Sequence, residues 1–351
     1  MRCFGSTVTL RSPAQGNPVR PRTPTHFAWV AWALLAFILL LPAAGQAQSS
    51  EVSASSTQLT PLEVNRQELV EMAVVGSIAA PRMAQPPYRI APDGTARALP
   101  GTGSITYNYR VGDSAVDMAG DHVEPAVSIS TDDTAEETGL NVLSQVGNRV
   151  RVLSGEAQGA EGTVIGKHGG IENVMVEFPD PVYEELALGD RMQVRAVGLG
   201  MEPENVENLY IRNMSPTLLD AMTEAGMGVR EDGVLEVPVT HEIPAKIMGS
   251  GLGRNQVHSG DYDIQMFDEE VVERYELDSL RFGDIVAIMD ADHAHGRIYR
   301  TGAVSVGVVV HGISRVAGHG PGVTTLLTSP EGNIAPVSDP EMNLARLLDL
   351  R

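Results

Sequence analysis

Short apolar runs separated by Gly, Asn and Asp recur along the chain from residue 105 onwards. Alternation of apolar and polar positions indicates half-buried strands, and the unbroken apolar run Val304–Val310 indicates a strand buried on both faces. The predicted strands cover residues 105–111, 123–129, 149–153, 162–166, 173–178, 192–197, 285–289 and 304–310. Their short lengths and close spacing predict a mainly β (α+β) fold, with a small β-barrel-like N-terminal half and a β-rich C-terminal half.

A few peripheral helices are expected beside these strands. Thr60-Pro61-Leu62-Glu63 has the form of a capping box with proline at the first helical position. Leu62, Leu69 and Ala73 then share one helical face, which predicts a helix of about four turns towards Val75. Shorter helices are expected after Ser215, Asp268 and Asp339, over residues 216–222, 268–275 and 340–348.

An apolar run from Phe27 to Leu41 stands close to the N-terminus. Four Arg and no acidic residue precede this run, and the small residues Gly45 and Ala47 follow it. This order is typical of a secretory signal peptide, here residues 1–47, and the run is short for a membrane span. We expect an exported protein, periplasmic or extracellular, that contacts a membrane only through this segment before cleavage. An uncleaved N-terminal anchor is the alternative.

A Ser-rich, flexible leader is expected over residues 48–59, followed by an N-terminal half over 60–210 and a C-terminal half over 211–351. The whole chain has 25 Lys and Arg, 45 Asp and Glu and a net charge of −20. Removal of the four Arg of the signal segment leaves 21 basic against 45 acidic residues, a net charge of −24. Such a surface repels nucleic acid and attracts divalent cations. The single cysteine, Cys3, lies in the signal segment, so disulfides and thiol chemistry are not expected.

The densest group of acidic and His residues follows the predicted strand 285–289 and comprises Asp290, Asp292, His293 and His295. On an extended chain the two Asp share one face and the two His share the other. Carboxylate and imidazole together suit a divalent metal such as Zn²⁺ or Mn²⁺. A polar turn in which the aspartates cap backbone amides is an equally good interpretation of the same residues.

Other polar residues at strand ends complete the candidate site. His122, His311 and His319 are candidate metal ligands, and Asp121 and Glu124 are candidate general bases. Gly249, Gly251, Gly253 and Arg254 form a glycine-rich loop that can hold an anionic ligand through backbone amides and one charge. A tight turn that requires positive φ is the alternative for this loop, which lacks the surroundings of a dinucleotide or phosphate-binding motif.

Five long strings resemble one family. They are LPGTGSITYNYRVGD (99–113), AGDHVEP (119–125), MGSGLGRNQVHSGDYDIQMFD (248–268), LRFGDIVAIMDADHAHGRIYRTGAVSVGVVVHG (280–312) and AGHGPGVTTLLTS (317–329). The chain is similar over nearly all of residues 61–350 to the domain-of-unknown-function 4438 family. This resemblance implies a mainly β fold with a distinct C-terminal half and implies no activity. Gly120-Asp121-His122 and the segment 290–295 are also loosely similar to motifs of acetamidase/formamidase enzymes, which are metal-dependent amidases.

Two functions are compatible with these observations. The first is a metal-dependent hydrolase of a small amide-like or carboxylated substrate, in which a metal-bound water is the nucleophile. The second is a non-catalytic ligand-binding or structural module, for which a homo-oligomer remains open. A stoichiometric transition metal that disappears when His293 and His295 are replaced by Ala would favour the first. Nucleic acid is not an expected partner of either.

Overall fold

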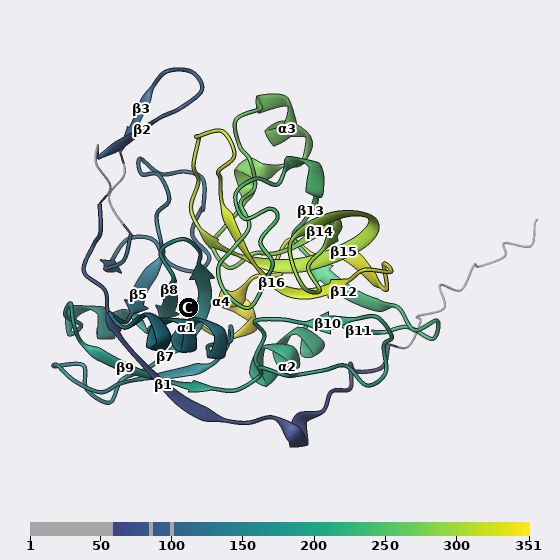
Figure 1. The fold of residues 1–351 in the computed structure, drawn as a ribbon, viewed down its shortest axis with the longest axis horizontal. Coiled ribbons are helices and arrows are strands. Elements are labelled where there is room, and N and C mark those ends of the chain that lie inside the picture. The colour runs from purple at the N-terminus through teal and green to yellow at the C-terminus, as the bar shows by residue number, and fades with distance from the viewer. Residues whose placement is uncertain (1–58, 84–86, 99–101) are drawn as a thin grey trace, which may run out of the picture. The chain divides into compact units, whose positions relative to one another are not determined.

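The computed structural model describes residues 59–83, 87–98 and 102–351 (Figure 1). The predicted signal segment 1–47 lies outside these residues, as does the leader 48–59 apart from its last position. The fold is mainly β, which confirms the predicted class, and it contains a closed barrel. Within the described residues, no helix combines the length and the apolar character that crossing a bilayer requires.

Six antiparallel strands close the barrel. In spatial order they are β1 (Met72–Ile78), β9 (Arg191–Ala196), β6 (Arg149–Val152), β7 (Glu161–His168), β8 (Asn173–Glu177) and β5 (Ala126–Ser130). The barrel closes because β5 also pairs with the end of β1, where Ser77 lies opposite Ser130. A two-residue strand, β4 (Ile105–Thr106), extends the sheet beside β5. Closure leaves few free strand edges in this part of the chain.

The second sheet has five strands from the C-terminal half. Their spatial order is β10 (Tyr210–Ile211), β16 (Gly322–Ser329), β15 (Ile298–His311), β14 (Ile285–Asp292) and β13 (His241–Pro244). A third sheet contains β11 (Gly228–Val229), β12 (Leu235–Val239) and β17 (Ile334–Ser338), and β2 (Tyr88–Ile90) pairs with β3 (Ala96–Ala98) in a hairpin. The C-terminal part of β15, residues 303–311, is buried, as the unbroken apolar run Val304–Val310 predicts.

The α-helices are α1 (Thr134–Leu143), α2 (Pro216–Glu224), α3 (Glu269–Arg274) and α4 (Leu344–Leu347). Helices α2 and α3 begin where predicted, since the side chains of Ser215 and Asp268 accept hydrogen bonds from backbone amides of the first turn. Helix α4 is shorter than predicted because Asn343, rather than Asp339, caps it. Helix α1, capped by Asp133, was not predicted. Short 3₁₀ turns occupy Arg66–Glu68, Asp180–Glu184, Ala245–Ile247 and Leu277–Ser279.

The predicted helix from residue 61 towards Val75 is wrong. Only the 3₁₀ turn lies there, and residues from Met72 onwards form β1, which pairs with six residues of β9. The capping-box pattern is a local signal, whereas the barrel needs a strand here to close. Packing also favours the strand, since a Cβ on Gly76 would come within 2.9 Å of Leu140 on helix α1. Long-range pairing therefore overrides the local helical pattern.

The barrel and the second sheet share one hydrophobic core, to which residues of both predicted halves contribute. Val127, Val164 and Val176 fill the barrel, while Val306 and Val308 of β15 belong to the same cluster. Gly166 of β7 lies directly against Val310 of β15, where a Cβ would overlap the valine side chain. This close approach sets β7 and β15 side by side, and each strand ends shortly afterwards at a histidine.

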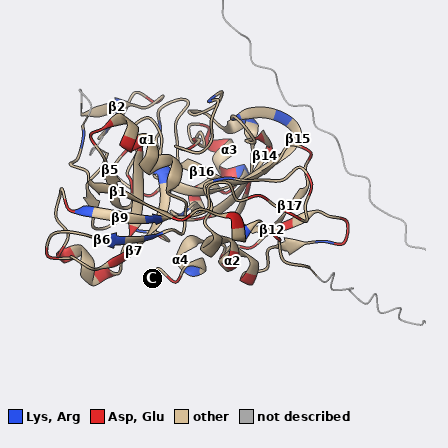
Figure 2. Ribbon diagram, turned by 60° about the horizontal axis from the view of Figure 1, so that its bottom comes forward, with Lys and Arg blue, Asp and Glu red and all other residues tan. Residues whose placement is uncertain are grey.

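Acidic residues occur on elements throughout the described part of the chain, with basic positions among them on β6 and β9 (Figure 2). A buried ion pair joins an arginine to the barrel. Arg110, on the segment that follows β4, contacts Glu177 at the end of β8, and its guanidinium lies 3.6 Å from the centroid of the Tyr183 ring. Glu177 also accepts a hydrogen bond from the Tyr183 hydroxyl at 3.0 Å. The pair thus joins residues 107–113 to the barrel. Of the predicted strand 105–111, only β4 (Ile105–Thr106) forms.

Replacing Arg110 with Met is expected to lower the free energy of unfolding by about 3–5 kcal/mol, because Glu177 would remain buried without its cation. Urea denaturation followed by circular dichroism measures this loss. Arg149→Met is the matched control, since Arg149 pairs with Glu161 at 3.3 Å on the exposed face of the barrel. The control should change stability by no more than about 1 kcal/mol. Equal effects of the two substitutions would contradict the role given to the buried pair.

Candidate metal centre

The ends of β7 and β15 bring two histidines together. His168 is the last residue of β7 and His311 is the last residue of β15. Their rings are stacked, with centroids 4.1 Å apart, and both side chains are buried. Because the two strands belong to the barrel and to the second sheet, this contact lies where the two sheets meet.

His122 joins them from a loop that runs beside the end of β15. The His122 amide donates to the carbonyl of Ile313, and the Gly312 amide donates to the carbonyl of Val123. The His122 backbone has a φ of 56°, an unusual conformation for a non-glycine residue. The centroid of its ring lies 5.3 Å from that of His311 and 5.1 Å from that of His319. Backbone pairing therefore fixes this imidazole against the other histidines.

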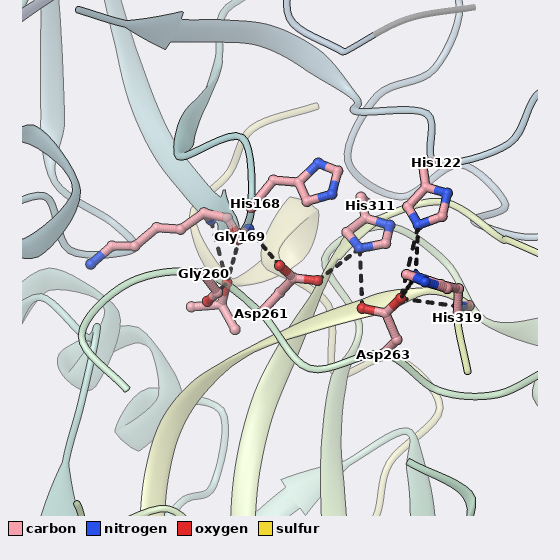
Figure 3. Close-up of polar contacts among 12 residues, drawn as sticks. His122, His168, Gly169, Gly260, Asp261, Asp263, His311 and His319 are labelled. Carbon is pink, nitrogen blue, oxygen red and sulfur yellow. Dashed lines mark hydrogen bonds and ion pairs between the residues drawn. The ribbon is translucent and has the colours of Figure 1, made fainter. Parts of the chain in front are cut away.

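Two aspartates complete the cluster. Asp261 and Asp263 alternate along the extended segment that leads past the start of β16, where Asp263 forms a bridge with Gly322. Both carboxylates are buried. The Asp261 carboxylate lies 2.7 Å from Nε2 of His311 and accepts a hydrogen bond of 2.6 Å from the amide of Gly169. Asp and His side chains from four separate parts of the chain thus point towards one another (Figure 3).

These side chains form two adjoining groups, each with ligand atoms within 4.8 Å of one another: His168, Asp261 and His311, and His122, Asp263 and His319. Asp263 faces both groups. Its Oδ2 lies 3.2 Å from Nδ1 of His319 and 3.9 Å from Nε2 of His122, while its Oδ1 lies 3.6 Å from Nε2 of His311. We call the six residues the His/Asp cluster. Asp263 thus presents one oxygen towards each of the two groups.

The second ring nitrogen of three of these histidines is held by a neighbour. Nδ1 of His168 lies 2.6 Å from Glu124, Nδ1 of His122 lies 2.6 Å from Asp121, and Nδ1 of His311 lies 3.0 Å from the carbonyl of Gly312. Each Nε2 is thereby left to face the cluster. Carboxylates and carbonyls in this position orient imidazole ligands and make them more basic.

Glu124 is itself held on every side. It accepts hydrogen bonds from the amide of Gly103, the hydroxyl of Ser128 and the side-chain amide of Asn173, besides its contact with His168. Burial opposes its charge, but the contacts with His168 and Ser128 outweigh burial and lower its pKa. Glu124 and Asp121 were expected to act as general bases. Their positions favour orienting His168 and His122 instead.

The buried acidic and His side chains of the cluster shift one another's pKa values. Burial alone would lower the pKa of His311, but Asp261 and Asp263 raise it well above its usual value. The pKa of His122 is lowered, mainly by burial, although the hydrogen bond that its ring donates to Asp121 raises it. The two carboxylates therefore favour the protonated form of the His311 ring. A divalent cation placed there would take over the same electrostatic role.

A cleft of about 570 Å³ opens onto the cluster. His122, His168, Asp261, Asp263 and His319 line it. His319 is the most accessible of the cluster residues, with a side-chain exposure of 31%. The predicted glycine-rich loop also reaches this cleft, which is lined by Gly251 and Arg254 but not by Gly249 or Gly253. Positive φ at Gly251 and Gly253 shows that the loop is at the same time a tight turn.

The segment 290–295 contributes no member to either metal-ligand group among the described residues. Asp290 accepts a hydrogen bond from the amide of Gly302, and Asp292 accepts one from the amide of Ala294. His293 is buried against Thr325, and burial lowers its pKa to about 3. The ring of His295 lies edge-on to that of Tyr210, 5.5 Å away. Both aspartates thus cap backbone amides, as the alternative interpretation of this segment describes.

Of the predicted ligands, the structure gathers His122, His311 and His319, and it adds three that sequence reasoning missed: His168, Asp261 and Asp263. His168 lies at the end of a predicted strand, in the same setting as His311. Asp261 and Asp263 stand two residues apart in Gly260-Asp261-Tyr262-Asp263, so an extended chain puts both carboxylates on one face. These two signals were available in the sequence.

The fold and the site define a class of protein. It has a β-barrel joined to a second sheet, and where the two sheets meet it has a buried His/Asp cluster that could hold a metal ion. The chain belongs to the domain-of-unknown-function 4438 family. The N-terminal family model matches residues 88–220 and the C-terminal model matches residues 226–348. A solved structure, titled "Crystal structure of TM1086", is similar with 41% sequence identity and a TM-score of 0.77. That similarity covers 82% of this chain and 99% of the other. Among curated proteins, none matches.

Replacing Glu124 with Gln is expected to weaken metal binding by about 10–100-fold, because His168 would lose the carboxylate that orients it. Competition with a metal-sensitive chelator dye measures the affinity. Glu137→Gln is the control, since Glu137 on helix α1 accepts a backbone hydrogen bond from Thr131 without touching the cluster. Thermal unfolding of both variants shows whether the fold survives. An affinity equal to that of the wild type in a folded Glu124→Gln variant would exclude the proposed orienting role.

Proposed function

We propose that this protein is a metal-dependent hydrolase of a small amide-like or carboxylated substrate, with a centre that holds two divalent cations. The observation that carries the proposal is the position of Asp263, whose two carboxylate oxygens face the two groups of the His/Asp cluster. Each group supplies two imidazoles and one carboxylate. A set of three protein ligands leaves coordination positions for water or substrate.

The donor set supports particular metals. Mixed imidazole and carboxylate ligands suit Zn²⁺ and Mn²⁺, whereas Mg²⁺ and Ca²⁺ favour sites built from oxygen atoms. When bound, such cations lower the pKa of a coordinated water and polarise the carbonyl that it attacks. Glu124 and Asp121 would hold His168 and His122 in position for this chemistry.

The protein's own residues would confine the reaction. Asp261, Asp263 and three of the histidines have little exposed surface, so most of the ligand atoms are shielded from bulk water. A cleft of about 570 Å³ suits a small molecule rather than a polymer. The loose motif similarity to metal-dependent amidases supports an amide-like substrate.

The proposal also includes export. The basic lead, the apolar run Phe27–Leu41 and the small residues at Gly45 and Ala47 support removal of residues 1–47 during secretion. The protein would then work in the periplasm or outside the cell.

We expect the protein purified without chelator to contain about two equivalents of Zn²⁺ or Mn²⁺ per chain, measured by inductively coupled plasma mass spectrometry. Asp263→Ala should lose most of both ions, since this residue faces both groups. The matched control replaces His293 and His295 with Gln, outside the cluster, and should keep both ions. If the control loses its metal while Asp263→Ala keeps both ions, the metal lies at the 290–295 segment, and the His/Asp cluster is not the metal site.

Hydrolysis is tested on the same preparations. The metal-loaded protein should release amine or ammonia from a panel of small amides, including formamide, acetamide and N-acetyl amino acids. Activity should disappear with a chelator and in Asp263→Ala, because water activation depends on the cations. Full metal occupancy without turnover of any amide would exclude the hydrolase and favour the alternative, a non-catalytic metal-containing binding module.

Expression of the full chain in a Gram-negative host tests export. The protein recovered from the periplasm should begin close to Gln48, as read by N-terminal sequencing. A product that retains Phe27–Leu41 and sediments with the membrane would show instead that the segment is an uncleaved anchor. Cytoplasmic recovery of the intact chain would contradict both outcomes.

A further inference from the structure

We infer that the substrate is a small carboxylic acid, and that Arg254 binds its carboxylate while the scissile bond lies at the His/Asp cluster. This inference rests on the proposed function and narrows its substrate class. It depends on the charge of the cleft, the position of Arg254 and the short distance between Arg254 and the cluster.

The lining of the cleft is richer in basic side chains than the chain as a whole. Apart from the cluster residues Asp261 and Asp263, the charged side chains that line it are Arg82, Arg89 and Arg254. The full sequence has 45 acidic against 25 basic residues. Three arginines around one opening of such a protein create a local positive potential that attracts an anionic ligand.

Arg254 is the arginine placed next to the cluster. A Cβ built on Gly169 would lie 2.9 Å from Nη1 of Arg254 and 3.1 Å from Oδ1 of Asp261. By the sum of these distances, the guanidinium lies at most about 6 Å from a cluster carboxylate. Because Gly169 and Gly260 have no side chains, the guanidinium has space beside the end of β7. A ligand that spans from the cluster to Arg254 therefore needs only a few bonds.

The backbone fixes Arg254 in this position. The Gly253 amide donates to the carbonyl of Arg297 at 2.8 Å, and the Arg297 amide donates to the carbonyl of Arg254 at 2.9 Å. Glu172 contacts the guanidinium of Arg254 at 3.4 Å, while the Arg254 side chain remains 38% exposed. Among the described residues Glu172 is its one side-chain partner, so other N–H groups of this partly exposed guanidinium can bind a carboxylate.

A buried cation adds to the potential behind the loop. Arg297 is fully buried, and its Nη1 lies 3.5 Å from where a Cβ on Gly251 would stand. Its side chain donates to the carbonyl of Ser259 at 3.2 Å, while Nε and Nη1 have no partner among the described residues. An arginine stays charged under these conditions. Its positive charge, which Asp261 and Asp263 partly offset, favours an anion at the adjoining loop.

The test compares pairs of acids that differ in one carboxylate. Malonate, succinate and glutarate, each against the monocarboxylic acid with the same number of carbons (propionate, butyrate and pentanoate), are titrated into the metal-loaded protein by isothermal calorimetry. Neither member of a pair has an amide that the proposed hydrolase could cleave. One carboxylate of either member can reach the cluster, whereas only the diacid offers a second carboxylate to Arg254. We expect at least one diacid to bind about tenfold more tightly than its monocarboxylic partner, since charge-assisted hydrogen bonds to Arg are strong. In Arg254→Gln this preference should vanish while metal content stays unchanged.

Arg149→Gln is the matched control, because Arg149 has a similar contact with an acidic partner, Glu161 at 3.3 Å, outside the cleft. The preference should persist there. Equal affinities for every diacid and its monocarboxylic partner, no binding of any of these acids, or a preference that survives Arg254→Gln would overturn the inference. Failure of the proposed function gives a different result: a wild-type protein without metal. An Arg254-dependent preference for diacids in that metal-free protein would retain the anion site and reject the hydrolase.

Discussion

The structure depends above all on keeping two carboxylates buried beside each other. Asp261 and Asp263 both lie within 3.6 Å of Nε2 of His311 and have little contact with solvent. Burying two like charges is costly unless positive charge and hydrogen bonds surround them. The neighbouring histidines, the amide of Gly169 and the amide of Gly320 meet this need. The same arrangement that stabilises the aspartates therefore makes a site for cations.

This constraint explains why a glycine-rich backbone surrounds the cluster. A Cβ on Gly322 would overlap the imidazole of His311, and one on Gly320 would overlap the carbonyl of Ile264. Close packing of main chain brings amides near the carboxylates and strands near each other. Larger residues at these positions would separate β15, β16 and the segment carrying the aspartates. The glycines thus allow backbone amides to approach the buried carboxylates, besides allowing the turns.

Much of the fold could be predicted because its signals are local. The strand pattern identified the class, and Ser215 and Asp268 marked helix starts through direct capping. The cluster was only partly predictable. His122, His311 and His319 stood out at strand ends, but their convergence depends on long-range contacts such as the backbone pairing of His122 with Ile313, which no local pattern reveals. The 290–295 segment is the densest in acidic and His residues, yet it lies outside both ligand groups among the described residues, because density in sequence does not measure proximity in space.

The cluster also bears on how the two halves of the family are related. The two family models divide the chain between residues 220 and 226, yet His122 and His168 precede that division while Asp261, Asp263, His311 and His319 follow it. Each triad takes ligands from both sides. Neither half alone offers a complete set of ligands, so a bound cation would link the barrel to the second sheet. Because a ligand that binds only the folded arrangement stabilises it, metal affinity and the association of the two halves are coupled.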